Sequence, residues 1–198
     1  MKKVLMVIAA IMLLMACNKQ TPKPKPLGYM RINFPEHKYV IFDSVGFPYT
    51  FEIPVYSRIE QDKDPNTKPY WINVYFPQYK ARIHLTYYHI HDNLDTMLDD
   101  SHILVYKHTV KADNITASDF TNDSLRVYAT LFTLEGNAAT PYQFHITDST
   151  NNFLRGALYF NTRPHYDSLY PYIKFLKKDI THLIETLEWK NASDKTNR

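Results

Sequence analysis

Four side chains that could transfer protons or form hydrogen bonds recur at helical spacing in the middle of the chain. His102, Tyr106, Thr109 and Asp113 are separated by four, three and four residues, so an α-helix would carry them on one face. A histidine near a carboxylate suits general acid–base chemistry, and a polar face equally suits docking of a partner protein. The simplest alternative is a helix end hydrogen-bonded to a sheet. Of the two functional interpretations, we favour docking.

Two histidines at the end of a predicted strand suggest a metal site without completing one. His89 and His91 are alternate residues, and imidazoles on one face of a strand can both bind zinc. A third ligand is needed, and only Asp92 is a candidate. The sequence has no nucleophile elbow, phosphate-binding loop, metalloprotease helix or paired-carboxylate motif. We expect a surface pair of histidines, no metal, no cofactor and no enzymatic activity.

The single cysteine, Cys17, stands where bacterial lipoproteins carry their lipid. A charged start, an apolar run over 4–15 and the small Ala16 precede it, so residues 1–16 are typical of a signal peptide. Cleavage after Ala16 would leave the Cys17 thiol to carry a diacylglyceryl group and its amine to carry an acyl chain such as palmitate. Several chains anchor a protein stably where one does not. The alternative is a secreted protein with a stray thiol.

The positive charge of the sequence belongs to its N-terminal part. The 198 residues include 23 Lys and Arg against 20 Asp and Glu, and five of the lysines lie before residue 28. The rest of the chain is close to neutral, which argues against nucleic acid as a partner. Residues 17–27 alternate Pro and Lys and should form an extended tether. The 16 Tyr and 11 Phe can supply a large aromatic core.

Alternation of apolar and polar residues predicts that most of the chain is β-structure. Ile83 and Leu85, for example, fall on one face of a predicted strand and His84 on the other. Two stretches have the helical period instead. The order of strands, helix, strands and helix predicts an α+β fold, a mostly antiparallel sheet with two packed helices. The predicted strands are 29–34, 39–42, 48–56, 70–76, 82–90, 115–120, 125–134, 142–147 and 153–160.

The two helices are expected over 92–112 and 169–187. Each has candidate capping residues at its start, and the second carries a continuous apolar stripe that should pack on the sheet. One domain should extend from 28 to 189, followed by a disordered tail over 190–198. The candidate caps are Asp92 and Asn93 for the first helix and Asp167 and Ser168 for the second; the stripe includes Leu176, Ile180 and Leu183.

Several separate motifs, in order along nearly the whole chain, resemble one known family. The chain is similar to the gliding motility lipoprotein GldD of the Bacteroidota, and this resemblance implies a part in gliding motility and in the associated type IX secretion machinery. It supplies no catalytic residues. The order of elements is also similar to Mog1/PsbP-type sandwiches, an analogy of fold alone. The motifs are P-K-P-x-G-Y-x-R-I-x-F-P over 24–35, F-P-Y-T-F-E over 47–52, W-I-N over 71–73, K-A-R-I-H-L over 80–85 and K-H-T-V-K-A-D over 107–113.

A short pattern resembles the periplasmic O-glycosylation signal of the same phylum. It is Asp followed by Ser or Thr and then by an aliphatic residue, Met or Thr, and it occurs five times. The alternative is structural, because Asp-Ser pairs suit turns and helix starts. The candidate acceptors are Ser44, Thr96, Ser124, Ser149 and Ser168.

These features predict a lipid-anchored accessory or scaffold protein of the cell envelope that is required for gliding and type IX secretion and contacts other proteins of that apparatus. Asn18 stands where an inner-membrane retention signal would have Asp, and no acidic run follows. We therefore expect the outer membrane, with the domain facing the periplasm. The alternative is a periplasmic enzyme or small-ligand-binding lipoprotein with an aromatic, histidine-lined cleft. Such a cleft would gather several of His84, His89, His91, His102 and His108.

Overall fold

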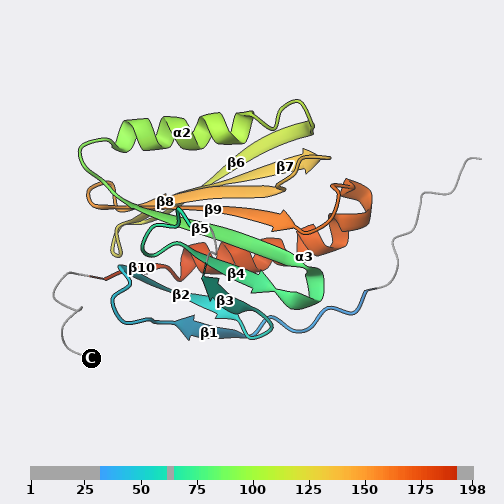
Figure 1. The fold of residues 1–198 in the computed structure, drawn as a ribbon, viewed down its shortest axis with the longest axis horizontal. Helices are drawn as coiled ribbons and strands as arrows, with labels where there is room; N and C mark the ends of the chain where they lie inside the picture. Colours follow the sequence, from blue (N-terminus) through green and yellow to red (C-terminus); the bar gives the residue numbers. More distant parts are fainter. Residues whose placement is uncertain (1–31, 62–64, 191–198) are drawn as a thin grey trace, which may run out of the picture. The chain divides into compact units, whose positions relative to one another are not determined.

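A large antiparallel sheet forms the middle layer of the protein. The computed structural model describes residues 32–61 and 65–190, and Ile32 begins one compact unit. Figure 1 shows helix α2 on one face of the sheet, and helix α3 together with a small sheet on the other. The predicted signal peptide, Cys17 and the tether lie outside the described residues.

The large sheet has seven strands in the order β3-β4-β5-β9-β8-β7-β6. Every neighbouring pair is antiparallel. The predicted α+β fold, with a mostly antiparallel sheet and two helices, is confirmed. The strands are β3 (Arg58–Gln61), β4 (Ile72–Phe76), β5 (Ala81–His89), β6 (Ala112–Asn122), β7 (Val127–Gly136), β8 (Tyr142–Thr147) and β9 (Asn152–Phe160).

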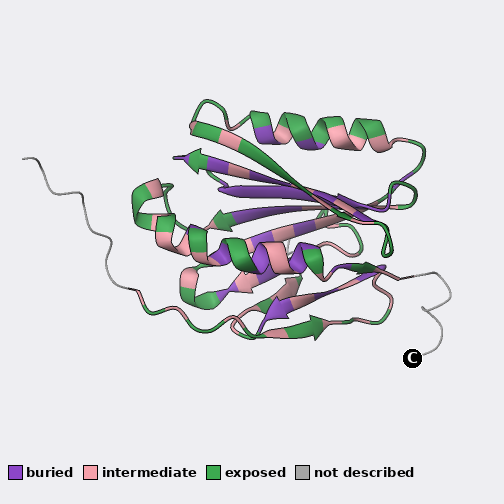
Figure 2. Ribbon diagram, turned by 180° about the vertical axis from the view of Figure 1, so that it is seen from behind, coloured by how far each residue is buried: buried purple, intermediate pink, exposed green. Residues whose placement is uncertain are grey.

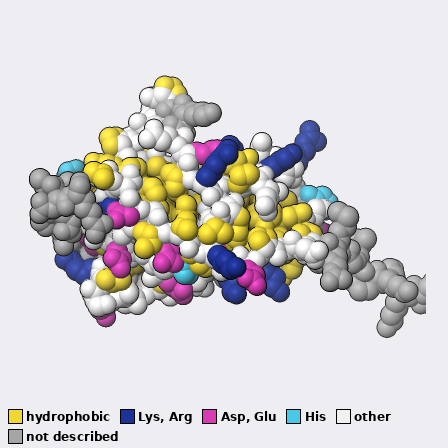
Figure 3. Space-filling view, turned by 90° about the horizontal axis from the view of Figure 1, so that it is seen from below, with side chains coloured by type: hydrophobic (Ala, Val, Ile, Leu, Met, Phe, Trp, Pro, Cys, Tyr) yellow, Lys and Arg dark blue, Asp and Glu magenta, His cyan; other side chains and the backbone are white. Residues whose placement is uncertain are grey.

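A second, three-stranded sheet has the order β1-β2-β10. Its strands are β1 (Tyr39–Phe42), β2 (Tyr49–Pro54) and β10 (Glu188–Trp189). Since β10 follows α3 and pairs with Tyr49 and Thr50, the end of the domain closes on its beginning. Figure 3, which views the molecule from the side of β1, shows hydrophobic side chains over much of this face, with charged side chains scattered between them.

The alternation of β5 is observed as predicted. Ile83 and Leu85 are almost completely buried in the main core, whereas His84 is half-buried on the opposite face. Figure 2 shows buried residues concentrated on the strands and on the inner side of α3. Gly156 of β9 allows close packing in this core, because a Cβ atom there would lie 2.0 Å from Cζ of Phe144.

Helix α3 (Tyr166–Glu185) packs its apolar stripe against the core. Leu176 and Ile180 have no exposed surface and Leu183 has 2%, so the predicted stripe is confirmed. The predicted caps are wrong. His165 is the N-cap residue and makes no side-chain capping hydrogen bond. Instead, the backbone N–H of Tyr166 donates to Oδ1 of Asn137, a distant residue that only folding brings to the helix start.

Helix α2 (Leu94–Tyr106) is shorter than predicted. Asn93 is its N-cap as expected, but the Asn93 side chain accepts a hydrogen bond from the His91 backbone N–H instead of capping the helix. The chain turns after Tyr106, and β6 begins at Ala112, which pairs with Gly136 of β7. Pairing with β7 therefore takes up residues that the sequence pattern alone assigned to the helix.

Other differences lie at the edges of the sheets. The short strands β3 and β10 were not predicted, because two to four residues carry little periodicity. Residues 32–34 of the predicted strand 29–34 form no strand; Phe34 stacks instead on Phe175 of α3, with ring centroids 4.3 Å apart. In the part of the chain that the structure describes, neither helix has the length and apolarity needed to span a membrane.

Candidate functional site

The structure does not place the four residues of the predicted docking face on one helix. His102 and Tyr106 are exposed residues of α2, Thr109 lies in the turn after it, and Asp113 belongs to β6. The Thr109 hydroxyl donates to the Tyr106 carbonyl, 2.8 Å away, and so supports that turn. The prediction of a common helical face was therefore wrong, because the helix ends at Tyr106 and does not include Thr109 or Asp113. Docking by these residues stays a prediction.

His89 and His91 lie together at the end of β5, as the sequence indicated. Their rings are 4.9 Å apart, edge to face. Nδ1 of His89 donates to the Asn151 carbonyl at 2.5 Å, which uses one ring nitrogen for holding the neighbouring turn. Among residues 32–61 and 65–190, no group of three His, Cys, Asp or Glu side chains could hold a metal ion.

The candidate glycosylation residues lie in turns or in the first turn of a helix. Thr96 and Ser168 are in the first turns of α2 and α3, and the other three are in turns between strands. Ser44 is half-buried and the remaining four are exposed. This placement fits modification and turn formation equally, so glycosylation stays a prediction, as does lipidation of Cys17, which lies outside the described residues.

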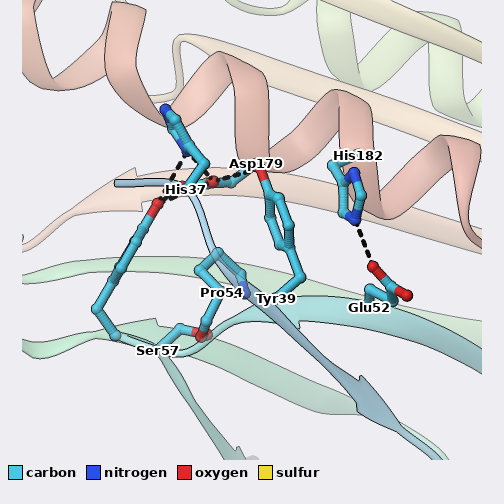
Figure 4. A network of polar contacts seen from close by, with 8 residues as sticks. His37, Tyr39, Glu52, Pro54, Ser57, Asp179 and His182 are labelled. Carbon is cyan, nitrogen blue, oxygen red and sulfur yellow. Dashed lines mark hydrogen bonds and ion pairs between the residues drawn. The ribbon is translucent and has the colours of Figure 1, made fainter. Parts of the chain in front are cut away.

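A buried carboxylate on α3 is the centre of a polar cluster that the sequence analysis missed. Asp179 is 1% exposed. One of its oxygens accepts from Nδ1 of His37 at 2.8 Å and from the hydroxyl of Tyr39 at 3.1 Å. The hydroxyl of Tyr56 lies 2.8 and 2.9 Å from the two carboxylate oxygens. Figure 4 shows His37 and Tyr39 converging on Asp179 from the strand side of the helix.

The cluster joins parts of the chain that are far apart in sequence. Its partners lie 142, 140 and 123 residues from Asp179, so no local motif could reveal it. One signal was available: Asp179 interrupts the apolar stripe beside Ile180. A charged residue on the buried face of a helix must find hydrogen-bond partners.

Electrostatics in the cluster are dominated by burial. Burial raises the pKa of the Asp179 carboxyl above its usual range, and the hydrogen bonds from Tyr56 and His37 only partly oppose this. Burial and the hydrogen bond to Asp179 also raise the pKa of the Tyr56 hydroxyl. Burial and the nearby Asp179 likewise raise the pKa of the Tyr39 hydroxyl. The hydroxyls of Tyr39 and Tyr56 are therefore neutral donors at physiological pH.

A second contact next to the cluster continues the attachment of α3 to the small sheet. Nε2 of His182 lies 2.6 Å from a carboxylate oxygen of Glu52 on β2, and Figure 4 shows this pair beside Asp179. The ring of Tyr39 stacks on the ring of His182 with centroids 3.6 Å apart. The arrangement ties residues from the beginning of the domain to its last helix. These contacts are between groups of the protein itself, which suits a structural role.

A large hollow lies elsewhere, at the end of the domain where β10 meets the turns before β7 and β9. It has a volume of about 760 Å³ and its lining includes the aromatic residues Tyr70, Tyr87 and Trp189 together with His89. The indole Nε1 of Trp189 is buried without a hydrogen-bond partner. Of the five histidines considered for a cleft, this hollow includes His89, while His84 lines a separate one.

Comparison of the fold and of the sequence with known proteins defines the class. The structure is similar to the solution structure of cyanobacterial PsbP (CyanoP) from Synechocystis sp. PCC 6803, with a TM-score of 0.50 and 10% sequence identity; the match covers 84% of this chain and the whole of that one. At this identity the similarity concerns the fold alone. The protein is thus an α+β domain of PsbP-like fold.

The sequence comparison then identifies the family. The family model described as "Gliding motility lipoprotein GldD" matches residues 19–189. The chain therefore belongs to the GldD family of gliding motility lipoproteins, and it is a lipoprotein of the cell envelope related to gliding. A search of curated proteins finds no match.

Proposed function

We propose that this protein is a lipid-anchored, non-enzymatic accessory protein that supports the assembly or stability of the gliding apparatus and of the associated type IX secretion machinery. It would be held in the outer membrane through acyl chains on Cys17, with its domain facing the periplasm. Membership of the GldD family supports the gliding part of this proposal. The position of Cys17 after a signal-like sequence supports the anchor.

The observation that carries the proposal is the attachment of the first described segment, residues 32–38, to α3. Phe34 of this segment stacks on Phe175 and meets Tyr172 edge to face. His37 binds Asp179 and also stacks on Phe175, with centroids 4.4 Å apart. Because the chain reaches this segment directly from the predicted tether, a pull on the anchor would be resisted by the core helix.

The same geometry argues against catalysis at the Asp179 cluster. A catalytic carboxylate must meet substrate, whereas Asp179 is 1% exposed and is surrounded by donors from the protein itself. An Asp–His pair serves nucleophilic catalysis when the histidine activates a hydroxyl or thiol, and the polar contacts of His37 are with Asp179 and Tyr56. We therefore assign the cluster a structural role.

The experiment is complementation of a strain that lacks the gene. We expect wild-type protein to restore spreading of colonies and secretion of a type IX substrate, and Cys17→Ser to restore neither, at equal abundance. Metabolic labelling with palmitate should mark the wild type and not the variant. Restoration of both activities by unlabelled Cys17→Ser would contradict the proposal. Membrane fractionation and protease accessibility in intact cells test the location and the orientation.

A second candidate function, binding of a small ligand, is favoured by the 760 Å³ hollow. Its aromatic lining and the unpartnered indole N–H of Trp189 are features of binding sites. Trp189→Phe removes the N–H donor and keeps most of the ring. If this variant restored secretion and gliding fully, the hollow would not be required for either.

A further inference from the structure

The face of the large sheet that α2 only partly covers contains a hollow beside a half-buried cation. Cross-strand neighbours place His84 of β5 beside Ala157 of β9, and Ala157 beside Gln143 of β8. Because the middle residue of this row is small, the larger neighbours form walls around it. The hollow has a volume of about 300 Å³, and its lining is His84, Thr86, Arg155, Gly156, Ala157 and Tyr159.

Arg155 supplies a positive charge that no carboxylate of the described residues neutralises in an ion pair. None of the ion pairs among residues 32–61 and 65–190 includes it. Its Nη2 donates to Oε1 of Gln143 at 2.6 Å, which is a bond to a neutral group. Burial lowers the pKa of the Arg155 guanidinium, and the charge of Arg155 in turn helps to lower the pKa of the neighbouring His108. A buried charge normally has a counter-ion, because desolvation is costly.

Two buried donors, one on Arg155 itself and one on the adjacent Gln143, have no hydrogen-bond partner. Gln143 is 1% exposed, and its Nε2 is buried without a hydrogen bond. The Gln143 amide must be oriented with Oε1 toward Arg155, because a guanidinium can only donate hydrogen bonds. Nε of Arg155 is also buried and unpartnered. Buried donors without acceptors are rare in folded proteins, since each costs free energy.

Two carboxylates act near this face without forming an ion pair with Arg155. Asp100 acts on Tyr88 and Asp119 acts on His145, and the charge of Arg155 acts on both of these residues too. Two aromatic walls, His84 and Tyr159, meet edge to face with centroids 5.4 Å apart. The hollow thus combines a guanidinium that has no ion pair among the described residues with two aromatic side chains in its lining.

We propose that this hollow binds a small oxyanion, a carboxylate or a phosphate, with the Arg155 guanidinium as the neutralising charge. Charge-assisted bonds from a guanidinium to such an anion are among the strongest hydrogen bonds in proteins. The rest of the ligand would lie against the His84 and Tyr159 side chains that line the hollow. The site is separate from the Asp179 cluster and from the larger hollow at Trp189, and it gives the protein a ligand beyond its proposed role as a scaffold.

The test uses the full lipid-anchored chain in a non-ionic detergent. Thermal unfolding is measured while sodium succinate or sodium phosphate replaces sodium chloride at constant ionic strength. We expect at least one of the two anions to raise the melting temperature in a saturable way, by roughly 2–4 °C when it is well above its Kd. The series that saturates identifies the carboxylate or the phosphate as the preferred group.

Arg155→Met keeps the length of the side chain and removes its charge, so it should abolish this rise. The matched control is Arg58→Met, which removes the same charge from the same face where Arg58 is exposed and paired with Glu60; it should keep the rise. An equal rise in Arg155→Met, or no rise with either anion in wild type, would overturn the proposal.

A second measurement keeps the proposal testable if Arg155→Met does not fold. In wild-type protein labelled at arginine, the Nε–H resonance of Arg155 should shift during titration with the stabilising anion, while that of Arg58 should stay in place. Titration shifts of equal size at both arginines would indicate a general salt effect and would also overturn the site.

Discussion

His145 should make the protein lose stability in mild acid. This residue of β8 is 5% exposed and lies against the inner side of α2, where the hydroxyl of Ser101 is 3.3 Å from its Nδ1. Burial, helped by the neighbouring His102, lowers the pKa of the His145 imidazole from 6.5 to about 4. The neutral form is therefore favoured in the folded protein, and protonation favours unfolding.

The sign and size of the effect follow from proton linkage. Because the pKa of His145 is lower in the folded protein than in the unfolded chain, its contribution to the free energy of unfolding is complete above pH 6.5 and is lost as the pH falls toward 4. Each pKa unit corresponds to about 1.4 kcal/mol, so the free energy of unfolding should fall by about 2 kcal/mol between pH 7.5 and pH 5, and by about 3 kcal/mol at pH 4.

The assay compares urea unfolding of the unlipidated chain across this pH range. His145→Gln cannot titrate, so it should remove most of the pH dependence even if it lowers stability at every pH. His91→Gln, at an exposed histidine, is the matched control and should follow the wild type. If His145→Gln and wild type lost stability in parallel between pH 7.5 and 5, the argument that His145 is held neutral by burial would be refuted.

Three further variants test the core and the Asp179 cluster. Leu176→Ala should lower the free energy of unfolding by about 2–5 kcal/mol, because removing a fully buried side chain leaves a cavity. The control Lys177→Ala, on the exposed side of α3, should change it by about 0.5 kcal/mol or less. Equal urea midpoints for the two variants would contradict the packing of Leu176 in the core. Gly156→Ala should cost about 1–3 kcal/mol through its clash with Phe144; an unchanged melting temperature in calorimetry would show that the ring can move aside. The pKa of Asp179 is raised in the folded protein, so its contribution to the free energy of unfolding is complete below about pH 4 and declines as the pH rises through the folded pKa. The stability of Asp179→Asn relative to wild type should therefore increase from pH 4 to 8 in chemical denaturation. A constant difference in free energy of unfolding between the two would argue that the carboxyl does not titrate in this range.

The sequence alone determined those strands and helices whose apolar pattern is visible over a few consecutive residues. Alternation along β5 predicted which side chains enter the core, because successive residues of a strand point to opposite faces. The stripe of α3 was equally readable, since Leu176, Ile180 and Leu183 recur at the helical period. The motifs spread along the chain were enough to indicate the GldD family, which the match over 19–189 confirms.

Helix boundaries were decided by tertiary contacts. The pattern through His102, Tyr106, Thr109 and Asp113 continues at helical spacing, yet the helix ends at Tyr106 because β6 pairs with β7 from Ala112 onward. The sequence carries no Gly or Pro at this point to mark the change. The helical pattern of these residues is therefore overridden by hydrogen bonds between β6 and β7, where Ala112 pairs with Gly136, more than twenty residues away.

The polar sites were decided by tertiary structure alone. Asp179 meets His37, Tyr39 and Tyr56 only because the first segment of the domain packs on its last helix. The environment of Arg155 likewise depends on the sheet, which places its guanidinium beside Gln143 and, among the described residues, in no ion pair. A sequence shows which residues carry charge, but burial and the choice of partner arise when distant strands come together, and these set the energy of a polar group.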